Sequence, residues 1–326
     1  MAVPELSNEQ RRQLIDTQQV YATWRETARG LEKIGTMRWQ KSKGKTYLYE
    51  AHGSVSKSQG RKTRDLERRK AEHDAERARL KDWAKVLDKR LNDMAPVNRA
   101  LGIGRIPTIA ARIVRALDRE GLLGSHIIVA GTNALYAYEA ATGTLLQSEH
   151  VATTDADLLW DTRQSLLLAA TGVRREGIMG VLRKVDQSFR SDYGMNPTNR
   201  DGYIVDLLCA ESADFESMKV GADILAVQMP GAEWLLNSPR FEQVIVGGDG
   251  LPLRIVVPDP RTYALHKLWV SRRADRNPLK RPRDAAHARV VSELVRTYLQ
   301  LPFTAKTMPW LPKELKALLP QLRKAA

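Results

Sequence analysis

The pattern of hydrophobic and polar positions in the N-terminal third predicts two long helices and a break. Residues 8–34 form the first predicted helix, with Ser7 suited to its N-cap. Residues 63–94 are helix-forming and heavily charged, and their apolar positions are sparse, which favours a long exposed or partner-packed helix over a full coiled coil. A break is expected at residues 96–104, which begin with a proline.

Between these helices, bulky and polar residues alternate around the sequence KSKGK, which predicts a basic β-hairpin. Aromatic and cationic side chains are interleaved on its strands. Such a surface can stack on bases while its cations meet phosphates, but a small hairpin also uses aromatic residues to cover its own face. On the first interpretation the nucleic-acid-binding candidates are Trp39, Lys41, Lys43, Lys45 and Tyr47.

Beyond residue 104 the pattern changes to short apolar runs separated by helical segments. Residues 106–123 have helical spacing, and residues 125–143 predict a strand, a small-residue turn and a helix. An inserted hairpin is expected at residues 141–153, followed by apolar strands at residues 153–161 and 202–210. The sequence thus predicts an α/β core.

The strand TTDADLLWD carries two carboxylates one residue apart. Successive strand side chains point to opposite faces, so Asp155 and Asp157 share one face and Ala156 takes the other. Two acids held so close raise each other's pKa unless a cation lies between them. Taken alone, such a pair is more often two solvated turn or strand-end acids than a metal site.

Charge is distributed unevenly over the 326 residues. Residues 1–124 hold 27 Lys and Arg against 16 Asp and Glu, a large part of the total net charge of +14. This excess favours a polyanionic partner, with nucleic acid ahead of a membrane surface, although a solvated basic surface would have the same composition. No run of 18 uncharged apolar residues and no signal-peptide pattern is present, so we expect a cytoplasmic protein without membrane association.

Three motifs together suit phosphoryl or nucleotidyl transfer. Gly131 and Thr132 lie between a predicted strand and a helix N-terminus, where a bare backbone, N–H groups and one hydroxyl can meet a triphosphate. A lone carboxylate, Asp206, lies within the apolar run GYIVDLLCA and requires a partner there. With the two acids at 155 and 157 it would complete a set of hard oxygen ligands for Mg²⁺ or Mn²⁺.

These residues resemble the DNA polymerase β-type nucleotidyltransferase superfamily, whose pattern is a Gly-Ser or Gly-Gly turn, a D-x-D pair and a third acid. Over residues 20–300, AGTNALYAYEAATG and TTDADLLWD also resemble a bacterial family of nucleotidyltransferase-fold proteins. The resemblance implies metal-dependent transfer of a nucleoside monophosphate from an NTP to a hydroxyl. Asp155, Asp157 and Asp206 would bind the metal, although Asp201 competes with Asp206 as the third acid.

The segment after residue 258 is predicted as a helix, a basic loop and a second helix. It is partly similar to nucleotidyltransferase toxins of the abortive-infection type, in which Lys and Arg neutralise the triphosphate. This similarity implies nucleotide-binding roles for Lys267 and Arg283, with Asp284 in support. The later acid of that pattern falls near His287, where this chain has no carboxylate, and an ordinary solvated basic loop is the alternative.

The sequence therefore predicts a basic helical and hairpin region at 1–104, a polymerase β-like nucleotidyltransferase core with a mixed sheet at 105–258, and a helical region at 259–326. RNA is the leading acceptor because of the basic N-terminal third, with a tRNA 3′ end and a toxin or defence role suggested by resemblance alone. The alternatives are a non-catalytic nucleic-acid-binding protein that keeps the fold, and nucleotidylation of a small molecule.

Overall fold

A computed structural model describes residues 3–53, 55–163, 173–191, 196–213, 219–220 and 224–323. The chain divides into two compact units. One, here called the core, comprises residues 1–11, 104–249 and 253–326; the other, called the arm, comprises residues 12–103 with 250–252. In the part of the chain so described, no helix has the length and apolar character needed to cross a membrane.

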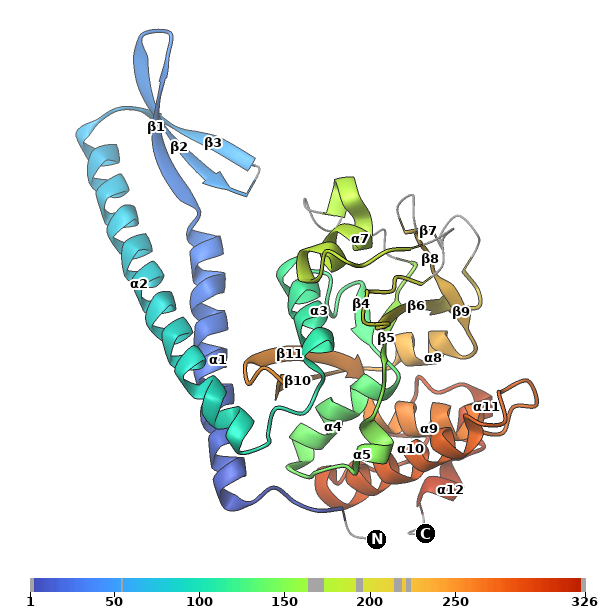
Figure 1. The fold of residues 1–326 in the computed structure, drawn as a ribbon. Helices are drawn as coiled ribbons and strands as arrows, with labels where there is room; N and C mark the ends of the chain where they lie inside the picture. The colour runs from blue at the N-terminus through green and yellow to red at the C-terminus, as the bar shows by residue number, and fades with distance from the viewer. Residues whose placement is uncertain are drawn as a thin grey trace. The chain divides into compact units, whose positions relative to one another are not determined.

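Two long helices form the shaft of the arm: α1 (Asn8–Ile34) and α2 (Arg64–Ala100) (Figure 1). Ser7 caps α1 as predicted, because its hydroxyl accepts from the Gln10 N–H while the Gln10 side chain accepts from the Ser7 N–H. The break predicted at residues 96–104 begins later than expected, because α2 continues through Pro96 to Ala100. Tertiary packing offsets the proline there, because residues 91, 95 and 98 of the same helix are buried.

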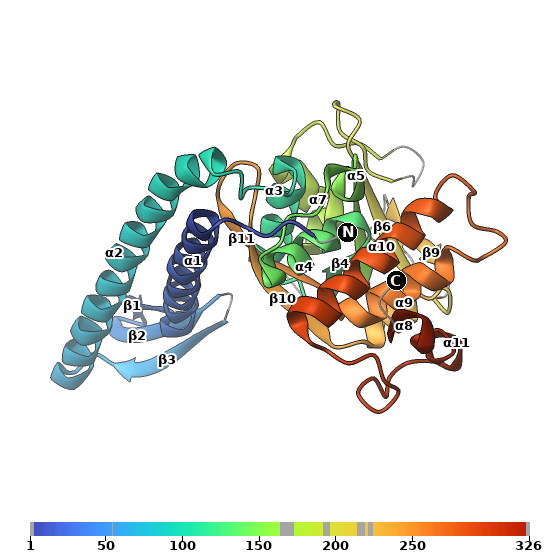
Figure 2. The same cartoon turned by 90° about the horizontal axis from the view of Figure 1, so that it is seen from below.

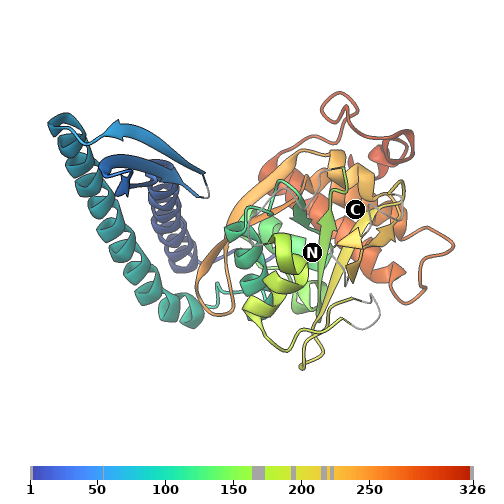
Figure 3. The ribbon, with the colours of Figure 1, turned by 90° about the horizontal axis from the view of Figure 1, so that it is seen from above.

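A three-stranded antiparallel sheet connects the two helices (Figure 3). The predicted hairpin is confirmed as β1 (Thr36–Ser42) and β2 (Lys45–His52) around Lys43 and Gly44, both with positive φ. A third strand, β3 (Val55–Arg61), pairs with β2. The pattern did not predict this strand because its residues, VSKSQGR, are almost entirely polar.

A four-stranded mixed sheet forms the centre of the core, in the order β4 (Ile127–Val129), β5 (Asp155–Trp160), β6 (Ile204–Ala210), β9 (Val227–Met229). The first pair is antiparallel and the others are parallel. Leu158 and Leu159 are fully buried, as expected of a strand covered on both faces. The predicted α/β class with a mixed sheet is therefore confirmed.

Helices and a second strand pair surround this sheet. They are α3 (Thr108–Arg119), the 3₁₀ turn η1 (Thr132–Ala134), α4 (Leu135–Thr142), α5 (Ser148–Val151), α7 (Val173–Val185), α8 (Ala232–Asn237), and the paired strands β10 (Arg240–Val246) and β11 (Pro252–Pro258). The two-residue strands β7 (Lys219–Val220) and β8 (Ile224–Leu225) pair with each other. The hairpin expected at 141–153 is wrong, because that segment holds the short helix α5.

The helices after residue 258 belong to the core unit. α9 (Pro260–Val270) and α10 (Arg281–Leu294) pack side by side, joined by the predicted basic loop (Figure 2). The chain continues through the π-helical turn η2 (Val295–Leu299) to α11 (Lys313–Lys316) and α12 (Leu319–Arg323). Asp259 starts α9 as an N-cap that accepts from the backbone N–H groups of residues 261 and 262.

Candidate active site

A glycine turn between β4 and α4 brings the backbone directly against a carboxylate. Gly131 has φ +54°, a conformation that L side chains rarely adopt, and a Cβ placed on it would lie 1.6 Å from Oδ2 of Asp157. Its carbonyl accepts a hydrogen bond from the Tyr263 hydroxyl at 3.0 Å. Thr132 and Asn133, both buried, begin the 3₁₀ turn that leads into α4. Only glycine fits this position.

The two acids of β5 lie on one face of the strand, and Ala156 is buried on the other. The parallel register pairs Asp157 with Asp206 of β6, which places the third carboxylate beside the second. Oδ1 of Asp155 accepts from the Thr153 hydroxyl. The apolar strands β5 and β6 therefore place all three acids next to one another and beside the glycine turn.

These carboxylates repel one another in a partly buried setting. Burial, opposed by the charge of Lys267 and reinforced by the charges of Asp155 and Asp206, raises the pKa of Asp157 to about 6. Burial also raises the pKa of Asp206, and Asp155 adds to that effect while Lys280 opposes it. The repulsion between these partly buried carboxylates destabilises the fold, and a bound cation would reduce that repulsion.

Basic side chains from α9 and the following loop supply positive charge. Nζ of Lys267 lies 2.8 Å from Asp284, whose other oxygen is 2.7 Å from Arg276, and the lysine charge also acts on Asp157. The structure therefore brings Lys267 to the carboxylates. Arg283 is exposed and donates to the Ala152 carbonyl, just before the strand that holds the acids.

Several neighbours of the site were not among the sequence candidates. Tyr263 supports the glycine turn, and Nε2 of the buried His287 donates to the His150 carbonyl at 2.8 Å. Burial lowers the pKa of His287 to about 4, so this imidazole is neutral. The Asn196 amide donates to Oδ1 of Asp206 at 2.7 Å, and Lys280 acts on two of the acids. No local pattern marks these residues, because each reaches the site through tertiary contacts.

The donor set suits a hard divalent cation. Across the described ranges, no three or more His, Cys, Asp or Glu side chains form a group that could by itself hold a metal ion. Mg²⁺, however, is usually bound by one or two carboxylates while substrate phosphates and water complete its shell. The mutually repelling oxygens of Asp155, Asp157 and Asp206 fit that mode of binding, in which the nucleotide brings the remaining ligands.

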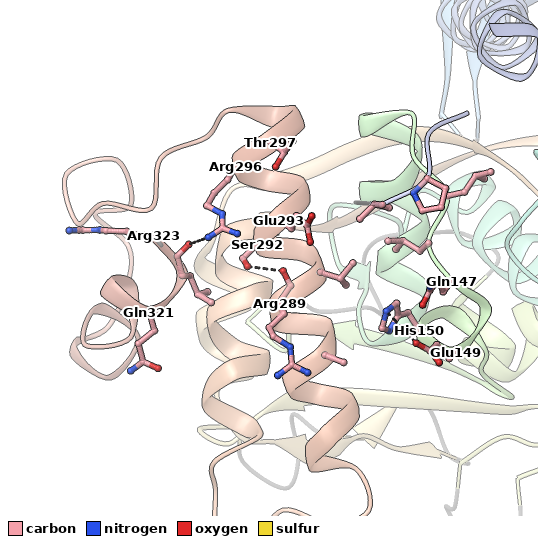
Figure 4. Close-up of a pocket in the computed structure, with 17 residues that line it drawn as sticks. Gln147, Glu149, His150, Arg289, Ser292, Glu293, Arg296, Thr297, Gln321 and Arg323 are labelled. Carbon is pink, nitrogen blue, oxygen red and sulfur yellow. Dashed lines mark hydrogen bonds and ion pairs between the residues drawn. The ribbon is translucent and has the colours of Figure 1, made fainter. Parts of the chain in front are cut away.

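Two cavities lie elsewhere on the core, and the three carboxylates line neither of them. One of about 550 Å³ includes Thr153 and Tyr203, which hydrogen-bond to Asp155. The other, about 740 Å³, lies between α10, the start of the chain and α5, with Arg289 and His150 at its wall (Figure 4). Its wall mixes acidic and basic side chains.

The hairpin residues proposed for nucleic-acid binding are divided by the arm sheet. Trp39 pairs with Leu48, which is fully buried, and Lys62, which lies between β3 and α2, is placed over the indole ring. Lys45 and Tyr47 belong to the opposite face, and Lys43 lies in the turn. Lys41 shares the face of Trp39.

Residues 108–310 match a family model described as Nucleotidyltransferase. The chain belongs to this nucleotidyltransferase family. The matched segment includes the glycine turn, the three strand acids and the α9–α10 region, so the predicted family and its general activity, nucleotidyl transfer, are confirmed. Comparisons with curated proteins and with solved structures found no match. The similarity to abortive-infection toxins stays a prediction.

Proposed function

We propose that the protein transfers a nucleoside monophosphate from an NTP to a hydroxyl of a nucleic acid, with RNA as the favoured acceptor, and that the reaction depends on Mg²⁺ or Mn²⁺. The register pairing of Asp157 with Asp206, opposite the bare backbone of Gly131, carries this proposal. It places carboxylates from two strands next to a turn that a triphosphate can approach. The basic arm favours a polyanionic acceptor.

In the proposed reaction, an acceptor hydroxyl attacks the α-phosphorus and the bond to pyrophosphate breaks. Asp155 and Asp157, with Asp206, would hold the cation, which supplies Lewis-acid stabilisation of the phosphate oxygens. Oδ1 of Asp206 already accepts from Asn196, which leaves Oδ2 to take the hydroxyl proton.

On the nucleotide side, the Gly131–Thr132 backbone would position the triphosphate. Lys267, held in place by Asp284, would offset charge that accumulates on the phosphates, and Arg283 would add to it from the next helix. Pyrophosphate carries the displaced electron pair away.

The test is incubation of the protein with Mg²⁺, labelled NTPs and total RNA, followed by detection of label on RNA. Asp155→Asn, Asp157→Asn and Asp206→Asn should each lower transfer by at least about 10³-fold, because each replaces a negatively charged carboxylate with a neutral amide that binds the cation more weakly. Asp201→Asn is the matched control. Asp201 is exposed in a turn before β6, and its loss should leave transfer unchanged.

Label on RNA that depends on the three acids supports the proposal. If label appears only on small molecules, the nucleic-acid acceptor is wrong, and if no acceptor is labelled and the Asp155→Asn protein behaves as wild type, the enzyme proposal fails. Loss of transfer in Asp201→Asn but not in Asp206→Asn would show that the third acid has been misassigned.

A further inference from the structure

The register of the arm sheet separates its side chains into two chemically different faces. The inner face includes Met37, Trp39, Leu48 and Glu50. The side chains of the opposite face, here called the open face, are Thr36, Arg38, Gln40, Ser42, Lys45, Tyr47, Tyr49, Ala51, Ser56, Ser58 and Arg61. Cross-strand partners share a face, so this division follows from the pairing alone.

The inner face is occupied by the arm's own helix. Leu48 has no exposed surface, and a Cβ added to its partner Gly60 would lie 3.6 Å from Leu66 of α2. Glu50 pairs with Arg69 of the same helix at 3.4 Å. The inner face therefore has a structural role in packing the sheet on α2.

The open face has the charge expected of a surface for a polyanion. Residues 36–62 contain seven Lys or Arg and one acid, and that acid, Glu50, lies on the inner face. Arg38, Lys45 and Arg61 are all exposed, and within the described part of the chain none of them takes part in an ion pair. Three cations thus share a surface on which no carboxylate neutralises them.

Two aromatic rings lie among these cations on the central strand. Tyr47 is paired with Arg61 of β3, and Tyr49 with Arg38 of β1. Both tyrosines are only half-buried. A sheet with rings on its middle strand and cations beside them offers stacking for unpaired bases together with contacts for the phosphates that connect them.

We propose that the open face of the arm sheet binds single-stranded nucleic acid, with bases on Tyr47 and Tyr49 and phosphates at Arg38, Lys45 and Arg61. The inference deepens the proposed function by naming the surface that holds the nucleic-acid acceptor, and it rests on that function for the acceptor's class. Binding itself requires neither the carboxylates of the core nor an NTP. Duplex nucleic acid, whose bases are already stacked, should bind more weakly.

The experiment measures binding of labelled single-stranded oligonucleotides of about 20 nucleotides, RNA and DNA in parallel, to the full chain by fluorescence anisotropy at several salt concentrations. The open-face variant is Arg38→Gln/Lys45→Gln/Arg61→Gln. The control, Lys57→Gln/Lys81→Gln/Lys89→Gln, removes the same net charge from exposed arm positions outside the open face.

We expect the open-face variant to bind at least about 10-fold more weakly and its slope of log affinity against log salt to fall by about 2, because three phosphate contacts are lost. The control should change affinity by less than about 3-fold. A separate variant, Tyr47→Leu/Tyr49→Leu, should weaken binding with little change in the salt slope, since stacking releases no counterions. Circular dichroism melting checks that each variant is folded.

Equal weakening in the open-face variant and the control, tighter binding of duplex, or no binding by the wild-type chain would each overturn the proposal. The Asp157→Asn protein separates this inference from the proposed function. It should bind the oligonucleotides as wild type does, even though it transfers no nucleotide.

Discussion

The core and the arm place their charges in opposite environments. In the core, three carboxylates lie on the two central strands of the sheet, where burial and mutual repulsion raise the pKa of Asp157 and Asp206. In the arm, the cations of the open face are exposed and lie where no acid opposes them. Buried charges of the same sign that lie close together indicate a site for a bound ion and its chemistry. Exposed charges of one sign indicate a surface that binds a partner of the opposite charge.

The largest effect we expect in the core, beyond loss of the carboxylates, is from Gly131→Ala. The added Cβ would displace Asp157, so transfer should fall by at least about 10³-fold and stabilisation by Mg²⁺ and NTP should disappear. Gly121→Ala is the matched control, because Gly121 also has positive φ but nothing lies within 4 Å of its Cβ position. It should lose only about 1 kcal/mol in the free energy of unfolding.

Activity assays and thermal shift with nucleotide check this prediction. If both glycine variants retain transfer to the same degree, the close approach of the turn to the carboxylate has no role in catalysis.

A smaller effect is expected on the free energy of unfolding when an ion pair is broken, and it should differ between a buried pair of the core and an exposed pair of the arm. Lys267→Met leaves the buried Asp284 with Arg276 alone, and should lower the free energy of unfolding by roughly 3 kcal/mol. Lys85→Met removes the exposed pair with Asp82 and should change it by less than about 0.5 kcal/mol. Urea unfolding monitored by circular dichroism measures both.

The proposed role of Lys267 in the reaction is separable from its role in stability. The double variant Lys267→Met/Asp284→Leu removes the buried carboxylate together with Lys267 and leaves only Arg276, whose side chain is 31% exposed to solvent, so it should recover stability without recovering transfer. Recovery of transfer along with stability would show that Lys267 acts only through packing.

The smallest expected effect is a pH-dependent gain in stability from Asp157→Asn in the absence of divalent cations. The folded-state pKa of Asp157, about 6, lies above the unfolded value of 3.8, so its stabilising contribution is complete below pH 3.8 and is lost as pH rises through 6. The introduced asparagine side chain does not ionise, so the variant does not undergo this loss of stability. The difference in free energy of unfolding between variant and wild type should therefore grow between about pH 4 and 6, then level off on the order of 2–3 kcal/mol.

Melting temperatures of wild type and variant from pH 4 to 8 check this prediction. Mg²⁺ with NTP should stabilise the wild type and not the variant, which reverses their order. A variant less stable than wild type at pH 8 without metal would show that Asp157 has a stabilising partner within the protein.

Much of the fold could be predicted because local patterns and tertiary packing agree. The helix 8–34, its cap at Ser7, and the strands that carry Asp155 and Asp206 all follow from periodicity and capping chemistry. Prediction failed where packing overrode local preference. Pro96 lies inside α2, and the polar strand β3 forms because β2 offers it backbone partners.

The sequence by itself determined which residue types lie near one another along the chain: a glycine turn before a helix, two acids on one strand face, and a basic hairpin with aromatic residues. Only the tertiary structure decided which of them meet. Parallel register pairs Asp157 with Asp206, and antiparallel register divides Trp39 from Tyr47. Register depends on backbone hydrogen bonds between segments far apart in sequence, and a one-residue shift would send every side chain to the other face.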